Sequence, residues 1–265
     1  MRAKLISAPY TIWMALFIIV PMGLVVFFAF TDKSGAFTLD NILRVGQYSN
    51  VFLRSIWLGA IATAISLLLG YPLAYTISKM KAKRQSVMIM LVMLPMWMNF
   101  LLRTYAWMSL LEDNGLINNM LAAIGLPRVH MINTAGAVVL GMVYNYIPYM
   151  ILPIYSVLTK IDNSVIEAAQ DLGANDRKVF LKVVLPMSMP GVISGITMVF
   201  VPAVSTFIIS KMLGGGGNLL IGDLIDMQFL GSAISLVLMV IILICMGIMN
   251  QFDDGDENMG GGMIL

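Results

Sequence analysis

Long stretches without a charged residue dominate the pattern of polar and apolar positions along this chain. Six such windows occur, over residues 5–31, 55–78, 85–102, 129–159, 183–210 and 227–252. A helix needs about 20 mainly apolar residues to cross the hydrocarbon of a bilayer. The pattern therefore predicts an all-α integral membrane protein in which residues 1–265 form a single transmembrane domain with six spans, at about 8–30, 55–78, 86–110, 132–158, 187–210 and 229–251.

The first window has a second interpretation, because Arg2 and Lys4 precede its apolar run as they would in a signal peptide. The apolar region of a signal peptide has only about 7–15 residues. This window has 27 uncharged residues, so we expect a retained membrane helix.

Lys and Arg residues are unevenly distributed between the two sets of predicted loops. With the N-terminus inside, the inner segments carry ten of them and the outer segments carry five. Positive residues in short loops stay on the cytoplasmic side, whereas acidic residues contribute little to orientation. We therefore expect both termini in the cytoplasm, in spite of the acidic tail at residues 253–257.

Composition agrees with a multi-pass protein of the cell membrane and excludes several other classes. Hydrophobic residues make up 59% of the chain and charged residues 11%, whereas a soluble domain has about 25% charged residues. A net charge of +2 gives no basic surface for nucleic acid. One cysteine, Cys245, and one histidine, His130, exclude a disulfide scaffold and a Cys/His metal site. We predict no metal site and no catalytic site.

Two groups of small residues have the spacing of helix-packing faces. They are Gly59, Thr63, Ser66 and Gly70 in the second span, and the GxxxG pair Gly191 and Gly195 in the fifth. Small side chains let helix backbones approach closely in a membrane, so we assign both groups a structural role.

The inner loop, residues 160–186, has the pattern of a helix, a turn and a second helix. Ser164 and Glu167 have the spacing of a capping box. Gly173 stands where a left-handed turn ends a helix, and Asn175 can cap the helix that follows. A narrow apolar face comprises Val165, Ala168, Ala169 and Leu172. From these residues alone, the helix either docks on a cytosolic partner or rests on lipid headgroups.

This loop resembles the EAA loop of binding-protein-dependent ABC importer permeases. The family pattern is E-A-A, three residues, G, nine residues, and I-x-L-P, and Val183 replaces the usual Ile here. The resemblance implies the type I ABC importer permease fold and a coupling helix that sits in a groove of an ATPase. The residues it assigns to ATPase coupling are Glu167, Ala168, Ala169, Leu172, Gly173, Leu185 and Pro186.

The chain itself is not expected to bind ATP, because the phosphate-loop sequence GxxxxGK[ST] is absent. Residues 214–217 are four glycines on the predicted outer side, which we expect to form a flexible loop. The resemblance therefore implies that ATP and Mg²⁺ are bound by a cytosolic ABC ATPase dimer. Two docking grooves on that dimer require a second permease subunit.

Within the superfamily, nearly the whole chain is similar to the B-type permeases of spermidine/putrescine importers. The stretches that carry this similarity are residues 37–41, 69–74, 94–105, 115–118 and 214–222. The similarity implies polyamine import with a C-type permease as the second subunit and an extracytoplasmic polyamine-binding protein. One departure is the short outer segment at residues 228–230, directly before the last span.

A polyamine path needs carboxylates or aromatic faces, which attract ammonium groups. No Asp or Glu lies within a predicted span, so acidic contacts are expected only at outer ends, from Glu112, Asp113, Asp223 and Asp226. The candidate path residues are Trp97, Asn99, Tyr105, Trp107, Tyr144 and Tyr149. The alternative is that Trp and Tyr only anchor the helices at the membrane interface.

Arg103 is an arginine at the end of the predicted third span. It would repel a polycation, so we expect it to form a structural or gating ion pair. Two other functions stay open: a permease of the same superfamily for another solute such as an inorganic anion, which Arg103 would suit, and a secondary transporter.

Overall fold

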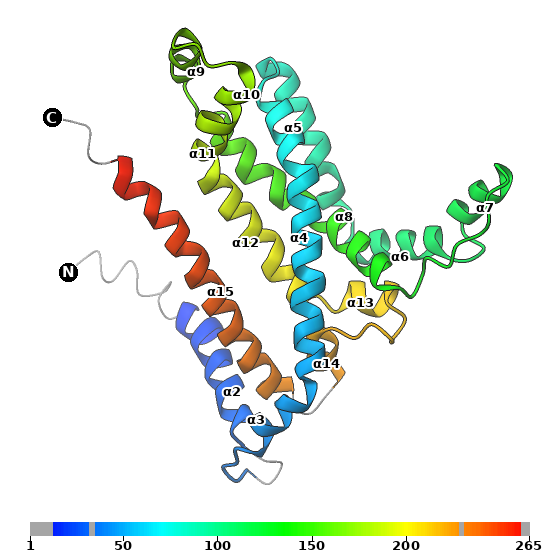
Figure 1. The fold of residues 1–265 in the computed structure, drawn as a ribbon. Coiled ribbons are helices and arrows are strands. Elements are labelled where there is room, and N and C mark those ends of the chain that lie inside the picture. The colour runs from blue at the N-terminus through cyan, green and yellow to red at the C-terminus, as the bar shows by residue number, and fades with distance from the viewer. Residues whose placement is uncertain (1–12, 32–34, 228–230, 261–265) are drawn as a thin grey trace.

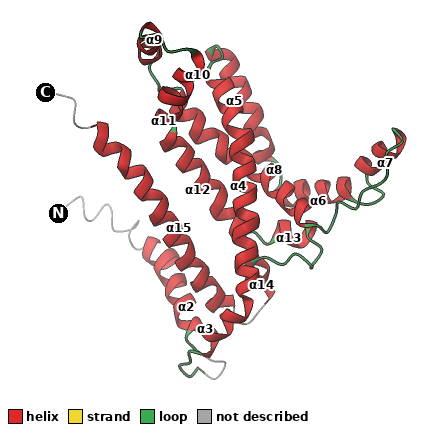
Figure 2. Cartoon of the chain, in the orientation of Figure 1, coloured by secondary structure: helices red, strands yellow, loops and turns green. Residues whose placement is uncertain are grey.

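The computed structural model describes residues 13–31, 35–227 and 231–260. Regular structure within these ranges is helical, apart from an isolated antiparallel bridge between Thr31 and Phe37, and Figure 2 shows this composition. The helices are η1 (Ala15–Ile19), α2 (Val20–Ala29), α3 (Asp40–Val45), η2 (Gly46–Tyr48), α4 (Ser49–Ser78), α5 (Ala82–Trp97), α6 (Phe100–Leu111), α7 (Leu116–Ala123), α8 (Ala135–Leu158), α9 (Asn163–Asp171), α10 (Asp176–Val179), η3 (Phe180–Val184), α11 (Leu185–Met187), α12 (Met189–Ser205), α13 (Ile208–Leu213), α14 (Ile221–Met227) and α15 (Gly231–Gly260).

Helices α4, α8 and α12 pack against one another and form the centre of the bundle (Figure 1). Glycines allow their close approach. A Cβ atom at Gly59 would lie 2.8 Å from Cγ2 of Val204, and one at Gly195 would lie 2.8 Å from Sδ of Met150. A larger residue at either position would require the neighbouring side chain or helix to shift. The packing role predicted for the small residues is confirmed.

A second layer consists of α2 and α15, which pack together beside the central helices (Figure 1). Its buried core includes Ala29 and Ile234, each with none of its side chain exposed. Large apolar side chains such as Phe27 and Leu243 lie exposed on the outside of this layer. An apolar outer surface of this kind suits contact with lipid.

The predicted helix over residues 86–110 is in fact two helices, α5 and α6, which meet at 88°. The side-chain oxygen of Asn99 accepts a hydrogen bond from the backbone N–H of Leu101 at 2.8 Å and caps α6. Pro95 lies in the last turn of α5 and has no N–H to donate to that helix. The span predicted over residues 86–110 is therefore a bent pair of helices rather than one straight helix, which apolar composition alone does not reveal.

By length and composition, three described segments qualify alone as membrane spans: Asp40–Ser78, Ala135–Leu158 and Gly231–Met249. Two bent pairs qualify jointly, Ala82–Trp97 with Phe100–Ala123 and Asp176–Met187 with Met189–Ser205, which raises the number to five. Ala15–Ala29 is a shorter apolar helix. The predicted span over 187–210 is interrupted between α12 and α13. The short segment at residues 228–230 lies outside the described residues.

Candidate functional site

Helix α9 protrudes at one end of the bundle, which we call the α9 end (Figure 1). Its N-cap is Asp162, whose Oδ1 accepts a hydrogen bond from the backbone N–H of Ser164 at 2.9 Å. The predicted capping box therefore starts two residues too late, because Asp162 already caps the helix and places Ser164 within the first turn. The hydrogen bonds from Ser164 lower the pKa of Asp162, since they stabilise the carboxylate.

The turn after α9 has the geometry that the sequence predicted. Gly173 has φ +81°, and its N–H donates to the carbonyl of Gln170 at 2.8 Å. The N–H of Ala174 donates to the carbonyl of Ala169 at 3.1 Å, which completes a Schellman motif. Asn175 then caps α10, because its side chain accepts a bond from the N–H of Lys178 at 3.0 Å. Both the glycine turn and the second cap are confirmed.

The apolar residues of α9 divide between two directions. Ile166 and Ala169 are half-buried and pack against the core of the bundle. Val165, Ala168 and Leu172 are exposed, and Leu172 has 90% of its surface accessible. The predicted single apolar face is thus partly used by the bundle itself. The exposed part leaves a small apolar surface at the tip of the molecule.

Phe180 fastens this loop to the central helices. Its ring packs edge-on against Tyr71 and Tyr75 of α4, with centroid distances of 5.9 and 5.3 Å. Nearby, the hydroxyls of Tyr71 and Ser188 are 2.8 Å apart in a buried hydrogen bond. The chain bends by 60° at Ser188, between the loop and α12. Movement of α9 would therefore be transmitted to α4 and α12.

The structure brings the predicted coupling residues into one loop, residues 160–186, which we call the coupling loop. Five of them are exposed and two half-buried. The exposed ones are Glu167, Ala168, Leu172, Gly173 and Pro186, and the half-buried ones are Ala169 and Leu185. An exposed helix with a rigid turn, attached to the bundle by an aromatic cluster, can bind a partner and transmit its motion.

The predicted path residues are only partly brought together. Trp107 and Tyr144 are in edge-on contact, with ring centroids 5.1 Å apart. They help to line an apolar groove of about 690 Å³ between α4, α6 and α8. Trp97 and Tyr105 instead point outward, with 74% and 56% of their surfaces exposed. Tyr149 is exposed beside Tyr146, and the side-chain oxygen of Asn99 is occupied as the cap of α6.

Arg103 is buried, with 7% of its surface exposed. Its guanidinium donates a hydrogen bond to the carbonyl of Pro95 across the bend between α5 and α6. It also lies 5.8 Å from the ring centroids of Phe100 and Tyr144. The ion pair expected for Arg103 is not among the salt bridges of the described residues. The reason is that the bend leaves a carbonyl for it to bind.

At the end of the bundle opposite α9, the glycine loop, residues 214–220, is held by polar contacts. Arg54 of α4 donates to the carbonyl of Gly217 at 3.1 Å and to the side-chain oxygen of Asn218. Asn218 in turn donates to the carbonyl of Asn133 at 3.0 Å. These contacts hold the loop that we expected to be flexible from its four glycines. Two of those glycines, Gly215 and Gly216, have positive φ angles.

Asp223 follows this loop at the start of α14 and is buried. Its Oδ2 accepts a hydrogen bond from the backbone N–H of Leu220 at 2.8 Å. Next to it, the hydroxyl of Ser55 accepts a bond from the N–H of Ile221 at 2.9 Å. The other predicted acid of this segment, Asp226, is exposed and pairs with Lys211 at 3.1 Å.

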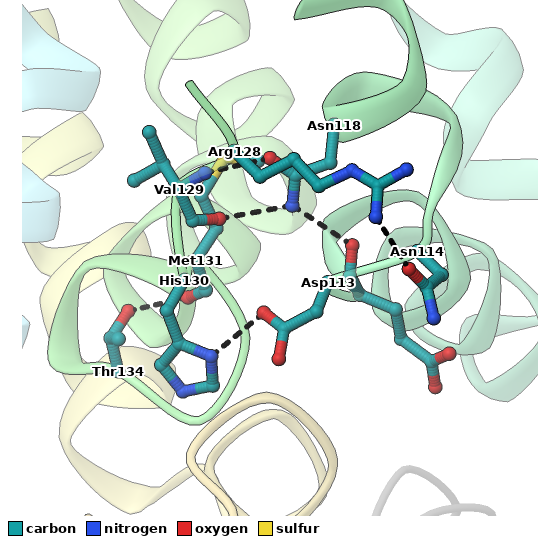
Figure 3. A network of polar contacts seen from close by, with 9 residues as sticks. Asp113, Asn114, Asn118, Arg128, Val129, His130, Met131 and Thr134 are labelled. Carbon is teal, nitrogen blue, oxygen red and sulfur yellow. Dashed lines mark hydrogen bonds and ion pairs between the residues drawn. The ribbon is translucent and has the colours of Figure 1, made fainter. Parts of the chain in front are cut away.

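The two remaining predicted acids, Glu112 and Asp113, lie in a polar network between α6 and α8, which Figure 3 shows. Asp113 Oδ1 is 2.8 Å from Nδ1 of His130, and both side chains are exposed. Asn118 is fully buried and exchanges hydrogen bonds with the backbone of Val129, at 2.9 Å in each direction. The network orders the connection from α7 to α8 (Figure 3).

Sequence reasoning missed several residues that build these sites. Asp162 had a local signal, because an Asp directly before a helix is a common N-cap. Arg54 and Asn218 had none, because their contact joins positions 164 residues apart. The same holds for Phe180, whose partners lie in another helix.

Comparison with known proteins identifies the protein family to which the chain belongs. Residues 2–254 match the family described as "Binding-protein-dependent transport system inner membrane component". The chain belongs to this family of ABC importer permeases, which are multi-pass proteins of the cell membrane.

Several individual proteins within this family are similar to the chain over most of its length. The "Spermidine/putrescine transport system permease protein PotB" of Haemophilus influenzae is 38% identical over 247 residues, which covers 87% of this chain and 86% of that protein. PotB of Escherichia coli K12 is 35% identical, covering 87% and 90%. Among solved structures, a bacterial ABC transporter that imports the acidic polysaccharide alginate superposes with a TM-score of 0.73 at 21% identity, covering 94% of this chain and 96% of that one. A second structure, with alginate pentasaccharide-bound periplasmic protein in complex, gives 0.71 at 21% identity and 91% coverage of both chains. These two establish the fold alone.

Proposed function

We propose that this chain is the transmembrane permease subunit of an ATP-driven importer that moves polyamines into the cytoplasm. The observation that carries the proposal is the exposed coupling loop on a membrane bundle whose sequence is 38% identical to a spermidine/putrescine permease. The subunit is non-catalytic. ATP and Mg²⁺ belong to a separate ATPase, and this chain binds no cofactor.

In the membrane topology that we propose, the chain crosses the bilayer six times, with both termini and α9 in the cytoplasm. The ten Lys and Arg residues of the inner segments support this orientation. The two bent pairs each count as one span, and the segment containing Ala15–Ala29 supplies the first. The α9 end then faces a cytosolic ATPase dimer, and the α14 end faces outward.

In the coupling step, α9 docks on the ATPase. Leu172, Ala168 and Val165 provide the apolar contact, and Glu167 lies exposed beside them. Ala168 and Gly173 allow a close approach to the ATPase, whereas Ala169 packs α9 against the bundle. Leu185 and Pro186 return the chain to the bundle. Because Phe180 connects the loop to α4, displacement of α9 shifts the central helices.

The remaining partners follow from the same arrangement. One chain supplies one coupling loop, so an ATPase dimer requires a second permease subunit, of the C type. An extracytoplasmic polyamine-binding protein delivers substrate at the α14 end. The structural relative that is in complex with a periplasmic protein supports this partner class.

For the substrate path, we retain the aromatic pair that lines the apolar groove. Half-buried Trp107 and Tyr144 offer ring faces to ammonium groups. Tyr149 stays a candidate at an exposed position beside Tyr146. Trp97 and Tyr105 are assigned to the lipid interface or the second subunit, because they point outward. Arg103 braces the bend through the carbonyl of Pro95, and its buried Nε has no hydrogen-bond partner among the described residues. The inorganic-anion alternative therefore keeps the residue that suggested it.

Uptake of labelled spermidine tests the function, in cells that lack polyamine importers and express this chain with its three partner proteins. We expect saturable uptake that stops when ATP is depleted. Uptake of sulfate but not spermidine would contradict the substrate, and spermidine uptake without ATP would indicate a secondary transporter.

Co-purification tests the coupling loop separately. Leu172→Asp places a charge on the exposed tip of α9, and we expect it to abolish recovery of the ATPase with the permease. Leu126→Asp is the matched control, since Leu126 is also exposed but lies after α7. Equal ATPase recovery with both variants would contradict docking through α9.

A further inference from the structure

Asp223 is buried, unlike the other acidic side chains of residues 35–227. It has 1% of its surface exposed. Its Oδ2 accepts the N–H of Leu220. The hydroxyl of Ser210 lies beside the carboxyl group but donates its hydrogen to the carbonyl of Phe207, so Oδ1 is buried without a donor. A buried carboxylate oxygen normally has a donor or a cation beside it, because leaving it unpaired costs free energy. An acceptor of this kind points to a ligand that carries the missing donor.

The neighbouring cations do not fill this role. Lys211 is committed to Asp226, with Nζ 3.1 Å from Oδ2. Arg54 is committed to the glycine loop, through Gly217 and Asn218. Burial raises the pKa of Asp223, which favours the neutral acid until a positive charge arrives. No salt bridge of the described residues involves Asp223, and a bound cation would favour its ionised form.

Asp223 also lies where the helical path is interrupted. A Cβ atom on the preceding Gly222 would lie 2.6 Å from the carbonyl of Thr206, in the break between α12 and α13. Broken helices at membrane depth occur where backbone lines a site or is buried in protein. Carboxyl and carbonyl oxygens suit an ammonium group rather than an anion.

We propose that Asp223 binds a primary ammonium group of the transported amine at the α14 end of the bundle. This inference rests on the proposed function and adds the residue that recognises the charge. In the described conformation Oδ1 is covered, so the ammonium group reaches it when the α13 and α14 segments separate. The hydrogen bond from Leu220 holds the carboxylate in position.

The test is the KM for labelled spermidine and putrescine in the complete importer with Asp223→Asn. The amide keeps the acceptor for the Leu220 N–H and the size of the side chain but loses the charge. We expect KM to rise about tenfold or more, the usual effect of losing one charge-assisted hydrogen bond, with the same ATPase activity in the absence of substrate. Because KM does not depend on the amount of transporter, a lower membrane level does not obscure the result.

Two further variants complete the experiment. Asp40→Asn is the matched control, since Asp40 is an exposed acid on the same predicted side, and we expect an unchanged KM. Asp223→Glu keeps the charge and is expected to retain a lower KM than Asp223→Asn. If the Asn variant gives no measurable uptake, transport by the Glu variant supports the proposal, and loss in both overturns it.

The outcomes separate this inference from the function on which it rests. If the wild-type importer takes up no polyamine, the proposed function fails. If the wild type transports spermidine and Asp223→Asn has the same KM, the function stands and the assignment of Asp223 is wrong.

Discussion

The loops at the two ends of the bundle differ in which side chains they expose and which they bury. The coupling loop exposes apolar side chains, including Leu172 at its tip, and is attached from beneath by the ring of Phe180. The glycine loop at the opposite end instead turns its polar groups inward, where Arg54 and Asn218 bind them. One end presents a surface to a partner, whereas the other closes over buried polar groups.

Both loops, although they lie at the ends of the bundle, are held by specific contacts. Each has glycine at positive φ, Gly173 in the coupling loop and Gly215 and Gly216 in the glycine loop. Each is ordered by contacts with α4, which passes through the whole bundle (Figure 1). Helix α4 is therefore in contact with both loops.

Of the substitutions considered, removal of the Phe180 ring is expected to reduce stability most. Phe180→Ala loses two edge-on ring contacts and leaves a cavity, so we expect destabilisation of about 3 kcal/mol. The measurement is the thermal unfolding midpoint of the purified complex, with proteolysis of the coupling loop as a local readout. Leu181→Ala, at a half-exposed neighbour, is the control. Equal losses in both variants would show that Phe180 is not the attachment.

The opposite end is tested through Arg54→Ala. This change leaves the carbonyl of Gly217 and the side chain of Asn218 without their donor, at an expected cost of about 2 kcal/mol. Hydrogen exchange in the glycine loop should accelerate, while exchange in α9 stays the same. Arg44→Ala removes only an exposed ion pair and should change little. Unchanged exchange after Arg54→Ala would mean that the glycine loop is rigid for another reason.

The turn that ends α9 gives a smaller effect. Gly173→Ala places a side chain at φ +81°, which costs about 1 kcal/mol in a left-handed conformation. We expect weaker recovery of the ATPase with the permease and faster amide exchange at the end of α9. Gly46→Ala is the matched control, because Gly46 has φ −56° and open space around it. If both substitutions weaken ATPase recovery to the same extent, the left-handed turn is not the cause.

The smallest expected effect concerns the Asp162 cap of α9, whose contribution to stability depends on pH. A carboxylate with a lowered pKa in the folded state adds stability above the ordinary Asp value, 3.8. That stability disappears as the pH falls through the lowered value. Amide exchange of the first turn of α9 should therefore accelerate, relative to the intrinsic rate, only in this acidic range. Asp162→Asn caps the helix without titrating and should remove the pH dependence; a dependence that persists would assign it to another group.

The sequence predicted the local features of the site well. Gly173 and Asn175 were located because a C-terminal glycine turn and an N-cap depend on neighbouring residues. The small-residue faces were located because helical periodicity aligns them. The Ser164 cap was misplaced, although Asp162 carried the same kind of local signal.

Features that depend on contacts between distant residues could not be predicted from local sequence patterns. The 88° bend at the end of α5 interrupts an uncharged window without changing its composition. The bend also decides that Arg103 binds a carbonyl rather than an acid. The order of the glycine loop follows from Arg54, which is 163 positions away from its acceptor at Gly217.

By itself, the sequence determined that this chain lies in a membrane, that its loop at 160–186 has a helix ended by a glycine, and that few charges lie in its apolar windows. These properties follow from composition and from contacts within a turn or two of the chain. Only the tertiary structure decided which apolar residues of α9 remain exposed and where Asp223 is buried. Burial depends on which helices pack together, and that information is spread over the whole chain.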